Sequence, residues 1–265
     1  MILSWVGLIL GLGGILVGQM LEGGGRIESL AALIQPTAAL IVFGGTLGAT
    51  LLASTPKEFS GAIRAIPKVF FGGGHNFQTL IKEIVDIASL ARKEGILSLE
   101  KKVKDIHNPF FEHNLRHIID GYDPIVLKDM METRIFTEEE EKMAIAKVFE
   151  TGGGYSPTVG IIGAVLGLIH VMENLSDSSK LGAGIAVAFV ATVYGVGIAN
   201  LILLPIGSKV KKIFKAECEE MTLICDGLLG IQAGLNPRVI EDRLNNLLGQ
   251  YTVEGQGAAD GRKAA

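Results

Sequence analysis

The stretch from Tyr155 to Leu175, YSPTVGIIGAVLGLIHVMENL, is apolar, with a proline near its start and glycines spaced along it. A second apolar segment, LGAGIAVAFVATVYGVGIANLILLPIG, follows at residues 181–207. Each is close to the ~20 residues that cross the ~30 Å hydrocarbon core of a bilayer. Neither segment contains an Asp or Glu before Glu173. If this pair of spans conducts an ion, it does so without a carboxylate of its own.

Two further apolar runs lie near the N-terminus, and neither contains Asp, Glu, Lys or Arg. The first begins without a basic leader and ends in GQMLEGGG rather than in a small-residue cleavage site, so we expect a retained helix rather than a signal peptide. Together with the opening pair they predict four membrane spans: Ile2–Met20, Leu30–Leu52, Tyr155–Met172 and Leu181–Ile206.

The composition agrees with a membrane protein that has a sizeable aqueous part. Of the 265 residues 48% are hydrophobic and 20% are charged, and the mean hydropathy is +0.41, so the charges must be segregated from the apolar runs. The formal net charge is −4, and no stripe of Lys and Arg interleaves with aromatic residues. These features exclude a nucleic-acid-binding protein.

The basic residues predict the orientation. Of the 24 Lys and Arg, only Arg26 and Lys180 lie in the two short loops between spans, whereas 14 fall between Ala53 and Gly154 and 8 follow Ile206. Because loops rich in Lys and Arg stay in the cytoplasm, we expect both termini and the central segment to be cytoplasmic.

The segments outside the spans show helical patterns. Apolar residues recur at spacings of three and four from Phe77 to Leu90, and residues 125–149 and 208–231 form further helical stretches. Asn236 and Pro237 suit the start of a last helix, and Gly72–Gly74 and Gly152–Gly154 are expected to interrupt helices. We predict an all-α protein with spans at 1–55, a helical cytoplasmic domain at 56–154, spans at 155–206, cytoplasmic helices at 207–249 and a disordered tail at 250–265.

Glycine pairs four residues apart, such as Gly163 and Gly167, predict tight bundling of the spans within or between subunits. The last two spans offer few polar side chains, none of them acidic: Thr158, His170, Thr192, Tyr194 and Asn200. Either these spans conduct nothing, or they form one wall of a path whose titrating group belongs to another chain.

Enzymatic chemistry is not expected. The sequence has no nucleophile–base pair, nucleotide loop or metal-ligand cluster; His113 and His117 share a helical face, but no glutamate motif accompanies them and no metal site is predicted. Cys218 and Cys225 are seven residues apart in a helical stretch, which places two partly buried thiols on one face and not in a disulfide.

Four spans, short external loops, a long helical insert and the segments YSPTVGIIGAVLGLIHVMENL and GIAVAFVATVYGVGIANLILLP together resemble the MotA/PomA flagellar stator subunits of the MotA/TolQ/ExbB ion-channel superfamily. The resemblance extends from Trp5 to about Gly249. It implies a ring, a pentamer, around a MotB-like partner whose single membrane helix carries an essential aspartate. It also implies a cytoplasmic contact with the rotor protein FliG.

The resemblance also assigns residues. The stretch ARKEGILSLE at 91–100 is similar to the rotor-facing segment of the family, which implies a rotor contact through Arg92, Lys93 and Glu100. On the ion path it implies Pro157, Pro205 and Thr192, of which Thr192 is the threonine that faces the aspartate of the partner. We include Tyr194 among the predicted ion-path residues. Ala164 departs from the second threonine of sodium-driven members, and a methyl group cannot coordinate sodium, so we expect protons as the transported ion.

The predicted function is therefore a stator subunit of the bacterial inner membrane that is surrounded by lipid and has no cofactor. With its partner it converts ion flow into torque. Two alternatives stay open. An ExbB/TolQ-like energiser has three spans with its insert after the first, and a non-conducting membrane scaffold would use the helices only structurally.

Overall fold

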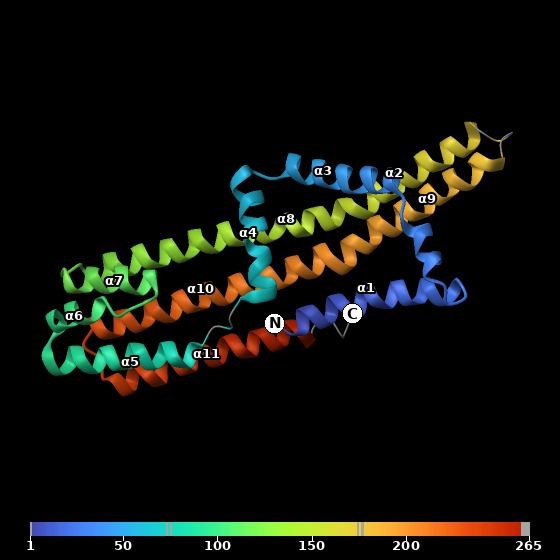
Figure 1. Cartoon of the computed structure of the whole chain (residues 1–265). Coiled ribbons are helices and arrows are strands. Elements are labelled where there is room, and N and C mark those ends of the chain that lie inside the picture. The colour runs from blue at the N-terminus through green and yellow to red at the C-terminus, as the bar shows by residue number, and fades with distance from the viewer. Residues whose placement is uncertain (1, 73, 75, 174, 176–177, 261–265) are drawn as a thin grey trace. The chain divides into compact units, whose positions relative to one another are not determined.

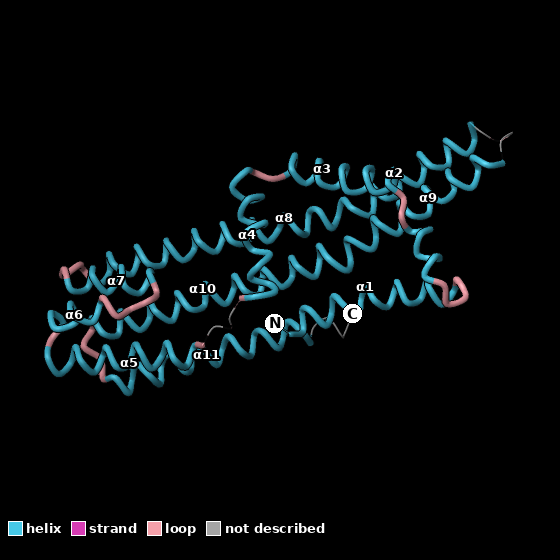
Figure 2. The backbone as a smooth tube through the Cα atoms, viewed as in Figure 1, coloured by secondary structure: helices cyan, strands magenta, loops and turns pink. Residues whose placement is uncertain are grey.

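A computed structural model describes residues 2–72, 74, 76–173, 175 and 178–260. All regular elements of this part of the chain are helices, as Figures 1 and 2 show, which confirms the all-α prediction. The chain divides into two compact units. The first unit comprises Met1–Gly73 and Glu141–Ile213, and the second comprises Gly74–Glu140 and Phe214–Ala265.

The first unit contains the apolar helices. The first is α1 (Ile2–Glu22), and the second is a continuous helix formed by α2 (Pro36–Ala39), the π-turn η2 (Leu40–Gly44) and α3 (Gly45–Ala53). The third consists of residues 141–173 of α8 (Pro124–Glu173). The fourth is α9 (Ser178–Ile198), continued by the π-turn η4 (Ala199–Leu203) and the start of α10 (Leu204–Gln232). By length and composition four helices can cross a membrane, which confirms the four predicted spans.

The second span begins later than the sequence predicts. Residues 27–33 form the short 3₁₀ helix η1 (Ile27–Leu33), and the helix proper starts at Pro36, not at Leu30. Gln35 is extended, with φ −124° and ψ 97°. The residue before a proline is disfavoured in helical conformation, and the proline itself fits the first helical turn, so Pro36 sets the start of the span.

Helix α4 (Pro56–Phe71) belongs to the first unit, although its residues were expected to lie in the cytoplasmic domain that starts at residue 56. Thr55 and Glu58 form a reciprocal capping box at its start, and Gly72 ends it. The Trp5 ring of α1 lies 4.9 Å from the Phe70 ring of α4. Aromatic contacts therefore join this amphipathic helix to the first span.

The expected interruption at Gly152–Gly154 is wrong. Helix α8 runs through these glycines and through Pro157 without a break. A Cβ added at Gly152 would lie 3.1 Å from Oγ1 of Thr50, and one added at Gly153 would lie 2.6 Å from Cδ2 of Leu204. These two glycines are packing positions of α8, because side chains of α3 and α10 lie against them.

The second unit has a core of its own. Its elements are α5 (Phe77–Glu94), η3 (Ile96–Leu99), α6 (Glu100–Val103), α7 (Pro109–Ile119), residues 124–140 of α8, residues 214–232 of α10, and α11 (Pro237–Asp260). The apolar faces predicted for residues 77–90 and 208–231 both contribute to that core. Its fully buried side chains include Ile84, Leu99, Phe111, Leu115, Leu127, Leu223, Ile224, Leu228 and Leu244.

The last helix starts as predicted, because the side chain of Asn236 accepts a hydrogen bond from the Arg238 N–H and Pro237 follows at the first helical position. Helix α11 then continues to Asp260, into the range 250–265 that was expected to be disordered. Once a helix exists, each added residue gains a hydrogen bond, so weak helix formers can extend it. Residues 261–265 of that range lie outside the described residues.

Candidate functional site

In the first unit, α8 and α9 pack backbone against backbone, side by side in Figure 1. A Cβ added at Gly160 would lie 2.9 Å from the carbonyl oxygen of Ala191, and one at Gly167 would lie 2.7 Å from the amide nitrogen of Ala188. Gly163 likewise faces Ala191. The Gly163/Gly167 spacing thus predicted a real helix contact, because small residues let membrane helices approach closely.

A buried hydrogen bond adds to this contact. The hydroxyl of Ser156, which is fully buried, donates to the carbonyl oxygen of Gly195 at 2.9 Å. Among the other glycine pairs four residues apart in the described spans, Gly11 lies against the Leu201 side chain, 3.3 Å from an added Cβ, and its pair mate and the remaining pairs have no such neighbour. Added Cβ atoms at Gly7, Gly14, Gly18, Gly44 and Gly48 would meet nothing within 4 Å.

Helices α2 and α3 cover one flank of the α8–α9 pair. A Cβ added at Gly45 of α3 would lie 2.7 Å from a methyl group of Val159 on α8. On α9, Val190 packs with Ala38 and Val42, and Tyr194 packs against the same cluster. Val159, Val190 and Tyr194 therefore mark the covered flank.

Three of the predicted ion-path residues lie on the opposite flank, which α2 and α3 leave uncovered. Successive residues of a helix are rotated by about 100°. Pro157 and Ala164 are two and five residues from Val159, and Thr192 is two residues from Val190, so all three point away from α2 and α3. Each is partly exposed. Ala164 and Thr192 directly follow the contacting pair Gly163 and Ala191, which places them at a similar depth in the pair.

The polar side chains of these spans bond to backbone carbonyls. Thr192 donates to Ala188 at 3.3 Å, Thr158 to Tyr155 at 2.7 Å and Asn200 to Val196 at 2.9 Å. The sequence has no Asp or Glu between Glu150 and Glu173 or from residue 181 to 213. The uncovered flank thus presents a threonine hydroxyl and small apolar groups, without an acid that could carry a proton.

Tyr194 lies apart from the other predicted ion-path residues, on the covered flank. Its hydroxyl donates to the carbonyl oxygen of Leu33 and lies 3.4 Å from the Gln35 N–H, which donates to it. Its ring stacks on Phe43 with centroids 5.7 Å apart. These contacts tie α9 to the start of the second span, just before Pro36.

Pro205 is exposed and lies two residues after the end of the π-turn η4. A proline lacks an N–H, and its ring clashes with the carbonyl four residues earlier, so the wider turn at 199–203 lets the helix continue through it. Next to Pro205, Leu204 packs on Gly153, and Gly207 packs on Phe149. The structure places Pro205 beside the α8 contact but pointing outward.

The predicted rotor-facing residues lie in the second unit, where α5 ends. Arg92 and Lys93 are in the last turn of α5, and Glu100 opens α6. Gly95 between them has φ +84°, a conformation that glycine adopts without strain. All three charged side chains are exposed. The turn at Gly95 keeps them on the surface of the unit.

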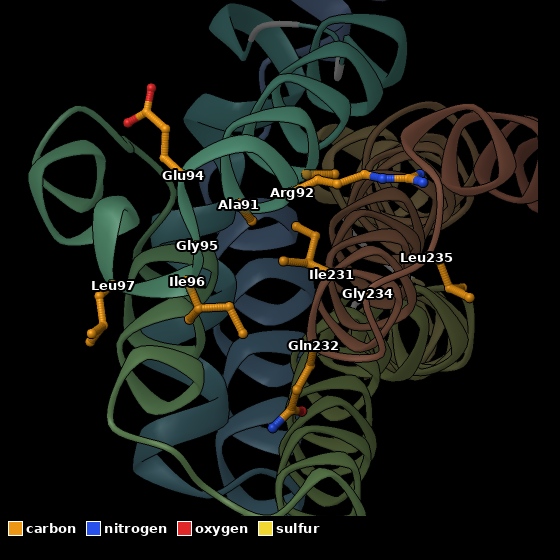
Figure 3. A pocket seen from close by; sticks show the side chains of 11 residues that line it. Ala91, Arg92, Glu94, Gly95, Ile96, Leu97, Ile231, Gln232, Gly234 and Leu235 are labelled. Carbon is orange, nitrogen blue, oxygen red and sulfur yellow. The ribbon is translucent and has the colours of Figure 1, made fainter.

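A groove of about 460 Å³ lies beside this turn (Figure 3). Arg92 lines it, whereas Lys93 and Glu100 are not among its lining residues. Ile96 and Ile231 point into its middle, and the Glu94 side chain points away. Sequence reasoning missed the contribution of the α10–α11 turn, which is more than a hundred residues from Arg92 along the chain: Ile231, Gln232, Gly234 and Leu235.

Comparisons with known proteins identify the family. The N-terminal family of motility protein A matches residues 5–95, and the MotA/TolQ/ExbB proton channel family matches residues 102–222. Motility protein A of Helicobacter pylori is 35% identical over 243 residues, which cover 92% of this chain and 93% of that protein. The chain belongs to the motility protein A family.

Solved structures of the motility protein A family have the same fold. The MotAB structure of Campylobacter jejuni matches with a TM-score of 0.85 and 30% identity over 92% of this chain and 94% of its own. The flagellar MotAB stator complex of Bacillus subtilis matches with a TM-score of 0.82 and 32% identity, covering 91% and 93%. The structural similarity, like the sequence similarity, extends over nearly the whole of this chain and of each relative.

Proposed function

We propose that this chain is a stator subunit of the flagellar motor in the bacterial inner membrane, with both termini in the cytoplasm. Together with a MotB-like partner it conducts protons and converts their flow into torque on the rotor. The uncovered flank of α8 and α9, with Pro157, Ala164 and Thr192 and without a carboxylate, carries this proposal. The relatives named above, one of them a flagellar MotAB stator complex, support it.

The partner supplies the acid in this mechanism. An aspartate on its single membrane helix binds a proton against the uncovered flank, because charge within hydrocarbon is costly and the chain offers no acid there. Neutralisation of the aspartate then changes how the helices pack near Pro157. The available work is about 2.3 kcal/mol per elementary charge per 100 mV, enough to shift a two-state packing equilibrium.

Protons are the proposed ion because Ala164 presents no oxygen. A carboxylate carries a proton unaided, whereas sodium needs several oxygen ligands to replace its hydration shell. Thr192 is the only hydroxyl-bearing residue among the three on the uncovered flank. The ion test is motility after collapse of the proton gradient compared with motility after removal of sodium. Dependence on sodium alone would refute the assignment.

The remaining parts of the proposal concern assembly and torque. Several copies of the chain, a pentamer, surround the partner in the lipid bilayer, and Arg92, Lys93 and Glu100 push on the rotor protein FliG. The exposure of these three side chains supports such a contact. An ExbB/TolQ-like energiser is disfavoured, because this chain has four candidate spans and matches the N-terminal motility protein A family.

Proton flux into liposomes tests the central claim. The chain co-purified with its partner should transport protons, whereas the chain alone, or the complex in which the partner aspartate is changed to asparagine, should transport none above the lipid background. Folding of each sample is checked by circular dichroism. Equal flux from the chain alone would mean that the titrating group is not supplied by a partner.

A further inference from the structure

Two histidines on α7 approach each other closely in the second unit. Nε2 of His113 and Nε2 of His117 are 3.2 Å apart, one helical turn from each other. Two nitrogens bound to one zinc ion at ~2.0–2.1 Å with near-tetrahedral angles are roughly 3.1–3.4 Å apart. The separation in the structure falls within this range, which also includes the length of an N–H···N hydrogen bond between the two rings.

The ring of His117 is held in place by its surroundings. It packs on the ring of Tyr122 with centroids 4.4 Å apart. The Tyr122 N–H donates to the His117 carbonyl, and Gln232 Nε2 donates to the Tyr122 carbonyl at 2.6 Å. Gly121, with φ +80°, makes this turn possible. A ligand ring fixed before the metal arrives loses less entropy on binding.

Two buried atoms beside this turn lack hydrogen-bond partners within the described residues. They are Nδ1 of His117 and Oε1 of Gln232. When Nε2 binds a metal, the ring proton sits on Nδ1, and metal-binding histidines usually donate that proton to an oxygen. Gln232 Oε1 is an acceptor without a donor, near the same tyrosine. No hydrogen bond joins these two atoms in the structure, so Gln232 Oε1 would accept the Nδ1 proton only after a change in the position of its side chain.

The charge around the pair also suits a cation. Asp120, the C-terminal cap of α7, adds negative charge close by. His113 is exposed, so an ion and its waters can reach the site.

We propose that His113 and His117 form a bidentate site for a divalent transition-metal ion such as Zn²⁺, with water in its remaining coordination positions. Imidazole suits zinc, nickel and copper, whereas magnesium and calcium prefer oxygen. The spacing in sequence alone did not favour this site; the nitrogen separation and the fixed ring do. The bound ion links two turns of α7 next to the α7–α8 corner, and it is independent of the ion path in the first unit.

Zinc titration of the complex tests the proposal. The full-length chain is purified with its partner, without a polyhistidine tag, stripped with chelator and titrated with ZnCl₂ by calorimetry. The wild type should bind one more zinc ion per chain than H113Q/H117Q, and each single variant should bind at least about tenfold more weakly. H107Q changes an exposed histidine outside the pair and should bind as the wild type does.

A second readout guards against misfolding of the double variant. Cu²⁺ bound to the wild type should show nitrogen couplings from two imidazoles by electron paramagnetic resonance, and from one in H113Q, whose change is on an exposed side chain. Identical zinc isotherms for the wild type and H113Q/H117Q, or an unchanged copper spectrum in H113Q, would overturn the assignment and leave the pair as an ordinary N–H···N hydrogen bond.

Discussion

The two units of this chain are helical, but they are built in opposite ways. In the first unit large apolar side chains face outward: Leu10 of α1 is 69% exposed and Phe189 of α9 is 70% exposed. Its buried contacts are made by small residues such as Gly160, Gly167 and Ala191. In the second unit Leu115 and Leu127 are fully buried, and charged residues lie on the surface.

The difference reflects the surroundings that suit each unit, which are lipid for the first unit and water for the second. Among lipid tails, burying a leucine gains little, so helices associate through close backbone approach and hydrogen bonds. In water, burial of apolar area drives packing at about 25 cal/mol per Å². The same kind of substitution should therefore act differently in the two units, which the following experiments test in order of decreasing effect.

The largest effect is expected in the core of the second unit. Leu115→Ala removes a fully buried side chain and leaves a cavity, which should lower stability by about 2–5 kcal/mol. Leu97→Ala, at a residue that is 75% exposed in the same unit, is the matched control. Thermal unfolding by circular dichroism measures both. Equal midpoints for the two variants would show that this unit does not depend on its buried leucines.

In the first unit a gain of one methyl group should be the harmful change. Gly167→Ala places a Cβ 2.7 Å from the Ala188 amide nitrogen and should cost about 1–3 kcal/mol. Gly154→Ala, on the same helix, meets nothing within 4 Å and is the control. Thermal stability of the detergent-solubilised protein should fall for the first variant only. An unaffected Gly167→Ala protein would mean that α8 and α9 are not in backbone contact.

A smaller effect is expected from the buried hydroxyl between α8 and α9. Ser156→Ala removes the hydrogen bond to the Gly195 carbonyl and should lower stability by about 0.5–1.5 kcal/mol. The same change at Ser208, which is exposed, serves as the reference. If both serine variants unfold at the wild-type temperature, the glycine contacts alone hold the pair together.

The smallest effect on stability, but a large one on motility, should come from the exposed charges of the second unit. The double variant R92E/E100K reverses the charges of Arg92 and Glu100 and keeps the net charge, so it should change the free energy of unfolding by less than about 0.5 kcal/mol. Swimming should be impaired, while the amount of protein in the membrane stays normal. K82E/D86K reverses another exposed pair on α5 and should swim. Normal swimming of R92E/E100K would remove these residues from the rotor contact.

Much of the fold could be predicted from the chain alone. Uncharged runs of about 20 residues indicated four spans, and the 3.6-residue periodicity of residues 77–90 indicated α5. These signals depend on local composition and on neighbours three or four residues away. The interruption expected at Gly152–Gly154 failed because glycine is either a helix breaker or a packing position, and only the partner helix distinguishes the two.

The candidate site was predicted less completely. The motifs pointed to Pro157, Ala164, Thr192, Tyr194 and Pro205, but they could not show that Tyr194 lies on the flank covered by α2. Nor could the sequence show that Ile231 and Leu235 share a groove with Arg92. Both facts depend on contacts between residues far apart in the chain.

The sequence by itself determined which segments avoid water and which carry charge, because solvation is a property of each residue and its helical neighbours. Tertiary structure alone decided which flank of α8 and α9 stays uncovered and that the α10–α11 turn shares a groove with Arg92. Those features depend on how helices rotate and pack about one another, and packing joins residues that no local pattern connects.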